Sequence, residues 1–330
     1  MRELADTAQR WITEGRSAVL ARPITEQGFG PRRPADAVLI DSDGHCEGTL
    51  YQGLFDTHLA AEAAALAPGH TAHVCQVSVH DNEAKQAGLT CGGQAEVLLQ
   101  PLNSIPAHWW ERLDDGGGVA LLTRLDDQQT EAASTVVALD QPDAAAPAQA
   151  AGQARRLLAR HRAGRETHYT DAGLVLIEAF AAIPHLVIVG GGELAELLCA
   201  QAHLLGWHAD VAHHDEDAQR VLADRRRSAC LIVLSHEPDL DIPAMRTALS
   251  LGIPYIGALG SRRTQSRRTT DLLEAGFTED SLRPIHGPIG LDLGARTPAE
   301  TALAICAEIL GALDRRTAGA LRDSSGPINT

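Results

Sequence analysis

The chain has 330 residues, a formal net charge of −15 and only eleven aromatic residues, and its length is typical of about two domains. The acidic balance argues against a general nucleic-acid binder, because neutralising phosphates requires a basic face. Residues 1–21 are charged throughout, without the apolar run of a signal peptide, and no stretch is apolar enough to span a membrane. Six scattered cysteines fit free thiols better than disulfides. We therefore expect a cytoplasmic protein that binds neither nucleic acid nor membranes.

The first half of the chain predicts an α+β fold. Leu4, Ala8 and Trp11 recur at helical spacing and indicate an amphipathic helix at the start. Apolar segments then alternate with turn residues and with one run of strong helix formers. We expect strands at residues 17–24, 36–44, 73–80 and 95–102, and a helix at residues 57–67.

The tetrad TCGG at residues 90–93 lies in the loop that enters the last of these strands. Two glycines in a row allow a positive φ and remove the Cβ atoms that keep a ligand away from the backbone, so Gly92 and Gly93 are candidate cofactor-binding residues. A thiol at such a place, Cys91, is a candidate nucleophile or a ligand for a metal or cofactor. The alternative is a small buried hydrophobic residue without a chemical role.

The domain boundary is expected after a linker-like segment. Residues 140–152 are rich in Pro, Ala and Asp and read as a loop or linker. The apolar run at residues 171–180 nevertheless predicts one more strand of the first domain. We therefore expect an α+β domain over residues 1–182 and a second domain over residues 183–330.

The second half alternates buried strands with helices, which predicts a Rossmann-like, doubly wound parallel sheet. The helix that ends the pattern carries a capping box, with Thr297 as N-cap, Pro298 at the first helical position and Glu300 two residues later. The expected strands lie at residues 185–192, 208–215, 229–236 and 254–261, and the expected helices at residues 193–206, 215–226, 241–252 and 297–313.

A glycine motif joins the first of these strands to its helix. Gly190, Gly192 and Ala195 form a G-x-G-x-x-A pattern, with Gly191 in between. In this context the first glycine permits a tight turn, and the third residue of the triplet lets the backbone approach a diphosphate. The unpaired N–H groups at the start of the helix then favour an anion.

The end of the second strand decides whether this motif fits a nicotinamide cofactor. NAD binding requires an acidic residue there, to hold the ribose. If the strand ends at His213, that ligand is missing, and if it continues to Asp215, the ligand is present. Both readings stay open.

Polar groups also follow the third strand. Ser235 and His236 stand at its expected end, with Asp239 and Asp241 just beyond. Ligands of doubly wound sheets bind at the carboxyl ends of the strands. If the protein is an enzyme, His236, Asp239 and Asp241 are its candidate general acid and base.

Two more segments are candidates for binding an anion. Ser261, Arg262 and Arg263 follow the fourth strand in a turn that offers a hydroxyl and two guanidinium groups, although a solvated basic turn is the alternative. A glycine-rich loop at residues 287–294 precedes the last helix and contains Asp292, a candidate acceptor or simply a turn residue.

The order of these motifs resembles the XdhC/CoxI family. The quoted segments are SAVLARPITEQGFGPRRPADAVLIDSDG, LTCGGQAEVLLQPL, VIVGGGELAELL, LSHEPDLD, PYIGALGSRRT and GPIGLDLGARTPAETALAICAEIL. Together they extend over nearly the whole chain, and the last two are the most specific. The family's plan of an N-terminal α+β domain and a C-terminal Rossmann-like domain agrees with the patterns above.

The resemblance implies a function as an accessory protein. Such proteins bind molybdenum cofactor as cargo and help to insert it into xanthine dehydrogenase-type or CO dehydrogenase-type enzymes. The implied partners are a molybdoenzyme client and a cysteine desulfurase, and the implied assembly is a homodimer. Cys91 is then a candidate ligand to molybdenum, since thiolates suit soft metals.

The chain departs from the family where a GS-x-x-GGC-x-E element is usual. Here Gln52 replaces one glycine and Leu54 stands in the place of the cysteine. This departure, with His213 and His214 at the second strand end, leaves two alternatives to the accessory role. One is an NAD(P)-dependent oxidoreductase or another small-molecule enzyme, and the other is a docking protein with a vestigial site.

Overall fold

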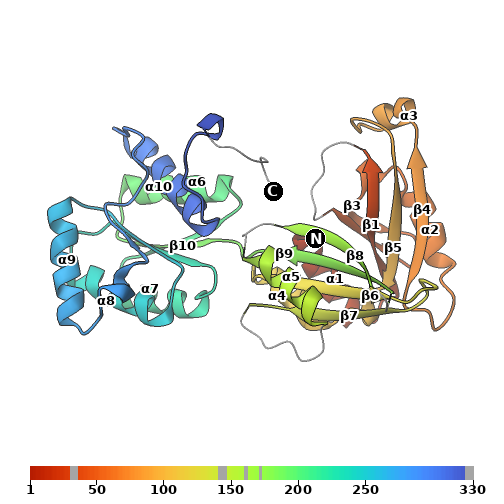
Figure 1. Ribbon diagram of the computed structural model, residues 1–330, viewed down its shortest axis with the longest axis horizontal. Coiled ribbons are helices and arrows are strands. Elements are labelled where there is room, and N and C mark those ends of the chain that lie inside the picture. The colour runs from red at the N-terminus through yellow and green to blue at the C-terminus, as the bar shows by residue number, and fades with distance from the viewer. Residues whose placement is uncertain (30–35, 140–146, 160–162, 171–172, 324–330) are drawn as a thin grey trace. The chain divides into compact units, whose positions relative to one another are not determined.

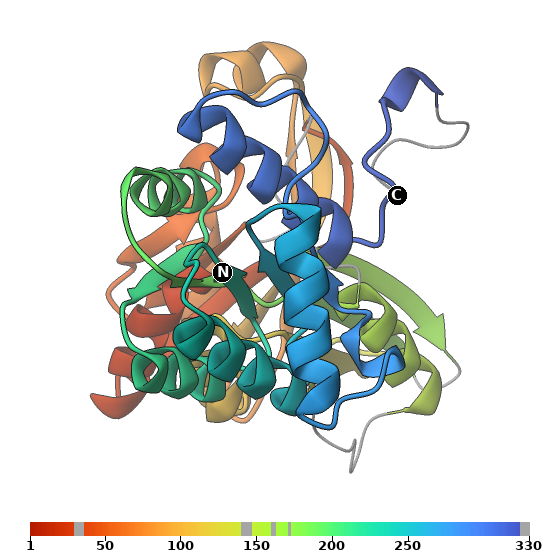
Figure 2. The same cartoon turned by 90° about the vertical axis from the view of Figure 1, so that its left-hand side faces the viewer.

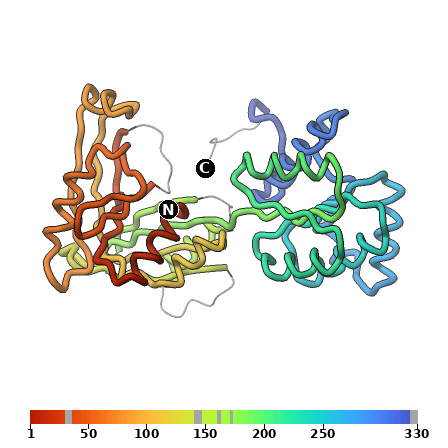
Figure 3. Tube along the Cα trace, turned by 180° about the vertical axis from the view of Figure 1, so that it is seen from behind, coloured from red at the N-terminus to blue at the C-terminus, as the bar shows by residue number. Residues whose placement is uncertain are grey.

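The structure is a computed structural model that describes residues 1–29, 36–139, 147–159, 163–170 and 173–323. The chain forms two compact units, Met1–Ala181 and Ala182–Thr330, and passes from one to the other once (Figures 1 and 3). Each unit is described by itself below. No helix among the described residues is both long and apolar enough to cross a membrane.

The N-terminal unit contains two antiparallel sheets. One has the order β3-β2-β1-β5-β4, and the other has the order β7-β6-β9-β8. Ile24 and Leu98 of the first sheet share a buried cluster with Leu125 and Leu174 of the second, so the sheets pack face to face. The strands are β1 Ala18–Gly28, β2 Ala37–Asp41, β3 Cys46–Thr49, β4 His73–Val79, β5 Gly93–Pro101, β6 Val119–Leu125, β7 Ala132–Val137, β8 Gly164–Thr170 and β9 Gly173–Phe180.

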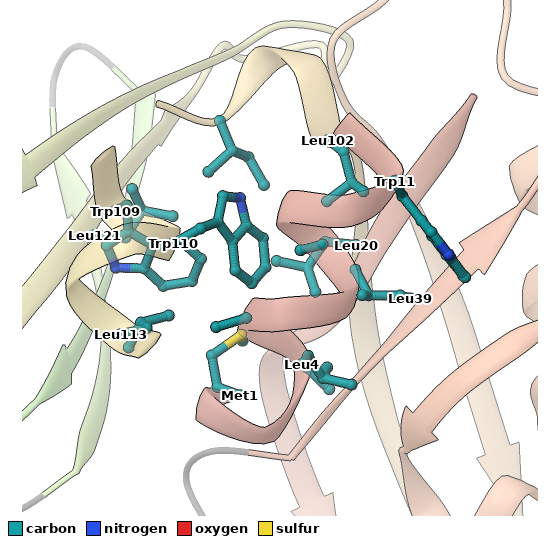
Figure 4. Packing of buried hydrophobic residues seen from close by; sticks show 14 of the residues in the cluster. Met1, Leu4, Trp11, Leu20, Leu39, Leu102, Trp109, Trp110, Leu113 and Leu121 are labelled. Carbon is teal, nitrogen blue, oxygen red and sulfur yellow. The ribbon is translucent and has the colours of Figure 1, made fainter. Parts of the chain in front are cut away.

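Helices cover these sheets and complete the core of the unit. Trp109 and Trp110 are fully buried and pack in one cluster with Trp11 and Leu20 (Figure 4). Burying a large aromatic side chain removes much apolar surface from water, so this cluster stabilises the start of the chain against β1 and β6. The helices are α1 Ala5–Thr13, α2 Asp56–Ala64, α3 Asp81–Gln86, α4 Ala107–Asp114 and α5 Ala148–Leu158.

A buried ion pair connects the two sheets. Arg22 of β1 is fully buried, and its Nε lies 2.9 Å from Oε2 of Glu178 on β9. Arg165 on β8 lies 3.0 Å from the other carboxylate oxygen of Glu178. Thr123 on β6 accepts a further hydrogen bond of 2.9 Å from Arg22. Because an unpaired charge in such a core is costly, this network favours a single register between the sheets.

The strands and helices expected in this half are confirmed, with one correction. Residues 148–152 belong to α5 rather than to a linker, because Ala151 and Ala154 bury a small apolar face against β6 and β9. The Pro and Ala content suggested a loop, but alanine is also the strongest helix former. The rest of that segment, residues 140–146, lies outside the described residues.

The C-terminal unit is a parallel sheet with helices on both faces, which confirms the predicted Rossmann-like fold (Figure 2). The strand order is β11-β10-β12-β13-β14. Helices α6 and α10 share one buried cluster with the sheet, and α7, α8 and α9 share another. The elements are β10 His185–Val189, α6 Glu193–Leu204, β11 His208–Ala212, α7 Asp215–Asp224, β12 Ala229–Val233, α8 Pro238–Leu251, β13 Tyr255–Ala258, α9 Arg262–Glu274, β14 Ile285–His286 and α10 Pro298–Leu313.

The strand order creates a switch point at β10. Its two neighbours in the sheet, β11 and β12, lie on opposite sides of it and run parallel to it. Connections that leave in opposite directions open a crevice at the carboxyl ends of the central strands, where ligands of this fold class bind. The residues after β10 and β12 therefore define the first place to look for a site.

The predicted capping box at the start of α10 is confirmed. Thr297 Oγ1 accepts a hydrogen bond of 3.2 Å from the Glu300 backbone N–H. Glu300 Oε2 accepts from the N–H groups of Arg296, at 2.7 Å, and of Thr297, at 3.0 Å. These backbone donors hold the pKa of Glu300 below its usual range, so the first turn of α10 and the loop before it are tied together.

Candidate functional site

The loop after β10 combines one tightly packed glycine with one open glycine. Gly190 has φ +102°, and a Cβ atom there would lie 2.8 Å from the backbone N of Ser235, just after β12. Only glycine allows the two strand ends to approach this closely. Gly192 has φ +95°, and a Cβ atom there would meet nothing within 4 Å. The backbone at Gly192 is therefore open to a ligand.

The start of α6 carries the features of an anion site and two features that oppose one. Gly192 is the N-cap and provides no side-chain cap, which leaves the first N–H groups of the helix for a ligand. Ala195 is buried and lets the helix pack closely on the sheet. Glu193 and Glu196 lie in the first turn, and their charges repel an anion. Binding a phosphate here therefore requires positive charge from a neighbouring strand end.

The second strand ends too early to offer a carboxylate for a ribose. β11 ends at Ala212, and Asp215 is the first residue of α7, where its Oδ2 accepts a hydrogen bond from Gln219. The ring of His213 lies beside the glycine loop, 3.2 Å from the position of a Cβ atom on Gly191. Of the two readings of this strand end, the structure selects the one in which an imidazole stands where NAD binding requires an acid.

The three candidate acid–base residues after β12 do not form one group. Asp241 is 2% exposed, and its Oδ2 lies 2.5 Å from a terminal guanidinium nitrogen of Arg268. His236 and Asp239 are exposed, and within the described part of the chain no hydrogen bond or ion pair connects either of them to Asp241. Asp241 is thus explained as half of a buried ion pair.

Arg268 holds two strand ends together and was not predicted from the sequence. It is 3% exposed and donates to the carbonyl oxygens of Leu259, at 2.6 Å, and of Ser235, at 3.0 Å. These carbonyls follow β13 and β12. A buried arginine in a run of exposed ones, QSRRTTD, has no distinguishing sequence signal, because only the fold turns this one residue inward.

The residues after β13 form the start of a helix. Gly260 has φ +134°, and Ser261 is the N-cap of α9, with its Oγ accepting from the Thr264 N–H at 3.3 Å. Arg262 and Arg263 are exposed and belong to the first turn of α9, not to the predicted turn. Two guanidinium groups thus follow the carboxyl end of β13, at the same edge of the parallel sheet as the start of α6.

The glycine-rich loop before α10 is held by a carboxylate that the sequence did not single out. Glu308 of α10 accepts hydrogen bonds from Tyr255 Oη at 2.6 Å and from the Gly290 N–H at 2.9 Å, and lies 3.3 Å from Nδ1 of His286. Burial alone would raise the pKa of Glu308, but these donors outweigh it and lower the pKa. The available signal was a single acid in the otherwise apolar stretch AICAEIL. Asp292, in the same loop, is exposed.

The glycine pair next to Cys91 lies in the N-terminal unit and is explained by backbone packing. A Cβ atom on Gly92 would lie 2.5 Å from the Val79 carbonyl oxygen, and one on Gly93 would lie 2.5 Å from the Gln27 carbonyl oxygen. The neighbouring strands β4 and β1 thus occupy the space that the glycines leave. Cys91 itself is half-buried, and its role as a ligand stays a prediction.

The other five cysteines are suited to packing. Burial raises the pKa of each of these thiols, to about 11 for Cys75 and Cys306 and to about 12 for Cys230. Burial also raises the pKa of Cys46 and Cys199. Protonated thiols are poor nucleophiles and poor metal ligands. The described residues contain no group of three or more His, Cys, Asp or Glu side chains placed to hold a metal.

The segment that departs from the family element has an unusual backbone. Tyr51, Gln52 and Gly53 all have positive φ, at +54°, +57° and +75°. The Tyr51 ring stacks on Phe29, with 4.3 Å between ring centroids, and its hydroxyl donates to Glu26 at 2.6 Å. These contacts hold a conformation that non-glycine residues adopt only at a cost.

The structure therefore gathers part of the predicted site. Gly190–Gly192, Ser235 and Ser261–Arg263 lie at the carboxyl ends of three adjacent parallel strands, β10, β12 and β13. This arrangement defines a Rossmann-type domain, with several of the candidate binding residues at one edge of its sheet, preceded by a unit of two antiparallel sheets.

Comparison with known proteins identifies the class more closely. The XdhC Rossmann domain matches residues 186–309, and the domain described as XdhC and CoxI family matches residues 11–78. A crystal structure from Bacillus halodurans, described as a xanthine dehydrogenase, has a similar fold over 96% of this chain and 98% of its own, with a TM-score of 0.55 and 19% identity. The chain belongs to the XdhC/CoxI family.

Two proteins of Escherichia coli strain K12 are similar in sequence. YqeB, described as uncharacterized, is 26% identical over 189 residues, which are 50% of this chain and 35% of YqeB. PaoD, named a molybdenum cofactor insertion chaperone, is 33% identical over 79 residues, which are 24% of this chain and 25% of PaoD. The chain thus matches between a quarter and about a third of the length of these relatives.

Proposed function

We propose that this protein binds molybdenum cofactor as cargo and delivers it to a molybdoenzyme of the xanthine dehydrogenase or CO dehydrogenase type. The observation that carries the proposal is the open backbone at Gly192, at the switch point of the parallel sheet. Membership of the XdhC/CoxI family and the name of the relative PaoD support the identity of the cargo.

In this proposal the C-terminal unit holds the phosphate of the cofactor. The N–H groups at the start of α6, beside Gly192, and the hydroxyl of Ser261 are the donors. Arg262 and Arg263 provide the charge that offsets the repulsion from the first turn of α6. Asp292 accepts a hydrogen bond from the organic part of the cargo.

The N-terminal unit contributes Cys91, whose thiol bonds to molybdenum or to its sulfur ligands. Burial raises the pKa of the five remaining thiols, which makes the thiolate form that binds a metal less accessible to them. The proposed partners are the client molybdoenzyme and a cysteine desulfurase, and the proposed assembly is a homodimer. Leu303 and Leu310, each about half exposed on α10, support a protein contact on the C-terminal unit.

The first experiment measures binding of the cargo under anaerobic, reducing conditions. Cofactor released from a molybdoenzyme is mixed with the purified chain, and molybdenum and pterin are quantified after gel filtration. We expect both to co-elute with the protein, and the double variant Arg262→Gln/Arg263→Gln to lose most of them. Arg267→Gln, which changes an exposed arginine further along the same helix, is the matched control. Absence of co-elution with the wild-type chain would refute the proposal.

A second experiment tests Cys91 separately. Cys91→Ser keeps the size of the side chain and removes the soft ligand, so we expect it to weaken molybdenum retention more than pterin retention. Cys46→Ser, at another half-buried cysteine of the same unit, is the control. Equal retention by Cys91→Ser and Cys46→Ser would restrict the binding role to the C-terminal unit.

A further inference from the structure

A cavity of about 540 Å³ lies in the N-terminal unit, between the first turns of α5 and the sheet that α5 covers. Its volume is within the range of small-molecule sites. The proposed function does not use any of its residues. The lining residues are Arg124, Pro147, Gln149, Ala150, Gln153, Arg156, His168, Tyr169, Thr170 and Val175.

Strand register explains why the sheet is open at this point. Arg124 on β6, Val175 on β9 and His168 on β8 are direct partners across three adjacent strands, so their side chains project from one face. Two residues further along, Leu122 and Ile177 share a buried cluster with α5. The helix therefore covers one row of the sheet and leaves the next row, with its arginine, as the floor of the cavity.

The cavity is rich in hydrogen-bond donors. Arg124 is exposed, and its guanidinium has no hydrogen bond or ion pair with any residue in the described part of the chain. Arg156 brings a second guanidinium, which Gln153 Oε1 orients through a bond of 2.8 Å to Nε. The first turn of α5 contains no acidic residue and no side-chain cap, so the N–H groups of Gln149 and Ala150 lack partners within the helix.

Among the residues that the structure describes, the carboxylates near the cavity are either engaged or border a second cavity. Glu166 accepts a hydrogen bond of 2.5 Å from Gln153 Nε2 and lies 3.2 Å from His168 Nε2. Asp126 and Glu131 line a separate cavity of about 430 Å³ that Arg124 also borders. Their charges repel an anion from that second cavity, so the larger one is the side of Arg124 that favours an anion.

We propose that this cavity binds the phosphate group of a small phosphorylated metabolite. Arg124 and Arg156 contact the phosphate oxygens, and the N–H groups of Gln149 and Ala150 complete the set of donors. The cavity is larger than a phosphate ion requires, which leaves room for the organic part of the ligand beside Val175 and His168. In a chain with a net charge of −15, a pocket whose described lining contains two arginines and no carboxylate is a local exception.

The test uses the full-length chain and a readout that distinguishes this cavity from the edge of the C-terminal unit. Inorganic pyrophosphate and ribose 5-phosphate are titrated separately while backbone amide resonances are followed by NMR. We expect both probes to shift the amides of Gln149 and Ala150, and ribose 5-phosphate alone to shift that of Val175. Shifts confined to residues 192–195 and 261–263 would overturn the proposal without touching the proposed function.

Variants measure the contribution of the arginine. Arg124→Gln should weaken binding at the α5 amides by about tenfold, since one charge-assisted hydrogen bond is lost. Arg10→Gln removes an exposed arginine from α1 of the same unit and should change nothing. Unfolding temperatures of both variants show whether the fold is intact. Equal affinity of Arg124→Gln and Arg10→Gln for ribose 5-phosphate would overturn the proposal.

Discussion

The two glycine-rich loops of this protein look alike in sequence and differ in what surrounds them. At Gly92 and Gly93, backbone atoms of neighbouring strands lie within 2.5 Å of where a Cβ atom would be. At Gly192, a Cβ atom would meet nothing within 4 Å. The first pair is needed for strands to pack, and the second loop leaves a surface for a ligand. A glycine motif therefore becomes evidence for a site only when the space beside it is known.

The largest loss of stability is expected at Gly93, because neighbouring strands fill the space next to this glycine. Gly93→Ala places a methyl group 2.5 Å from the Gln27 carbonyl oxygen and 2.6 Å from the Phe29 ring, and should destabilise the N-terminal unit by about 3 kcal/mol. Chemical denaturation followed by tryptophan fluorescence measures this, because three of the four tryptophans, Trp11, Trp109 and Trp110, lie in that unit. A loss below about 1 kcal/mol would show that the strands separate easily, contrary to their close packing.

Changing the open glycine should act on binding as well as on stability. Gly192→Ala forces a residue with a Cβ atom into φ +95°, at a cost of about 2 kcal/mol to the C-terminal unit. We also expect loss of cofactor retention, because the start of α6 must shift to relieve the strain. Hydrogen exchange localises the first effect and gel filtration with cofactor measures the second. Full retention of cofactor by Gly192→Ala would contradict the conclusion that the open loop at Gly192 binds a ligand and so differs from the packed glycines at Gly92 and Gly93.

Glu308 connects the glycine-rich loop of the C-terminal unit to α10, and its contribution should depend on pH. Its pKa is lowered in the folded state, so its contribution to stability is fully present above the unfolded value, about 4.5. That contribution is lost as the pH falls through the lower, folded value. Glu308→Gln should therefore cost about 1–2 kcal/mol at pH 7 and make the variant and wild type converge in acid. Parallel denaturation curves at pH 7 and pH 3 check this expectation.

The smallest expected change is in anion affinity, when one of the glutamates in the first turn of α6 loses its negative charge. Glu193→Gln removes one exposed negative charge from the first turn, and should raise affinity for inorganic pyrophosphate at that helix by about two- to threefold. The gain should shrink in high salt, which screens exposed charges. Isothermal titration at two salt concentrations measures both. Unchanged affinity at low salt would mean that the phosphate does not approach the start of α6.

Most of the fold could be predicted because its signals are local. The capping box at Thr297 and Glu300, the buried strand before Gly190 and the alternation of strands and helices depend on residues close together in sequence. The prediction of a linker at residues 148–152, where α5 begins, was wrong because the local signal there is ambiguous. A run of alanines with prolines fits both a loop and a helix, and only the face that α5 buries against β6 and β9 decides between them.

The site was less predictable, because its residues meet only through tertiary contacts. The positions of Gly190 and Ser261 just after strands followed from the pattern of the chain. The pattern of the chain did not predict that Arg268 is buried, that it pairs with Asp241, or that Glu308 contacts three hydrogen-bond donors. These contacts join residues that are between 18 and 53 positions apart in the sequence, and no spacing rule predicts them.

The sequence by itself determined the class of each unit, the family and the strand ends at which a ligand is expected, because periodicity, caps and glycine motifs are properties of neighbouring residues. The tertiary structure decided which glycines are open, which carboxylates are engaged, and where an arginine that has no partner among the described residues borders a cavity. Those distinctions depend on the atoms that fill the space around a residue. That space is set by strands and helices far away along the chain, through packing and register.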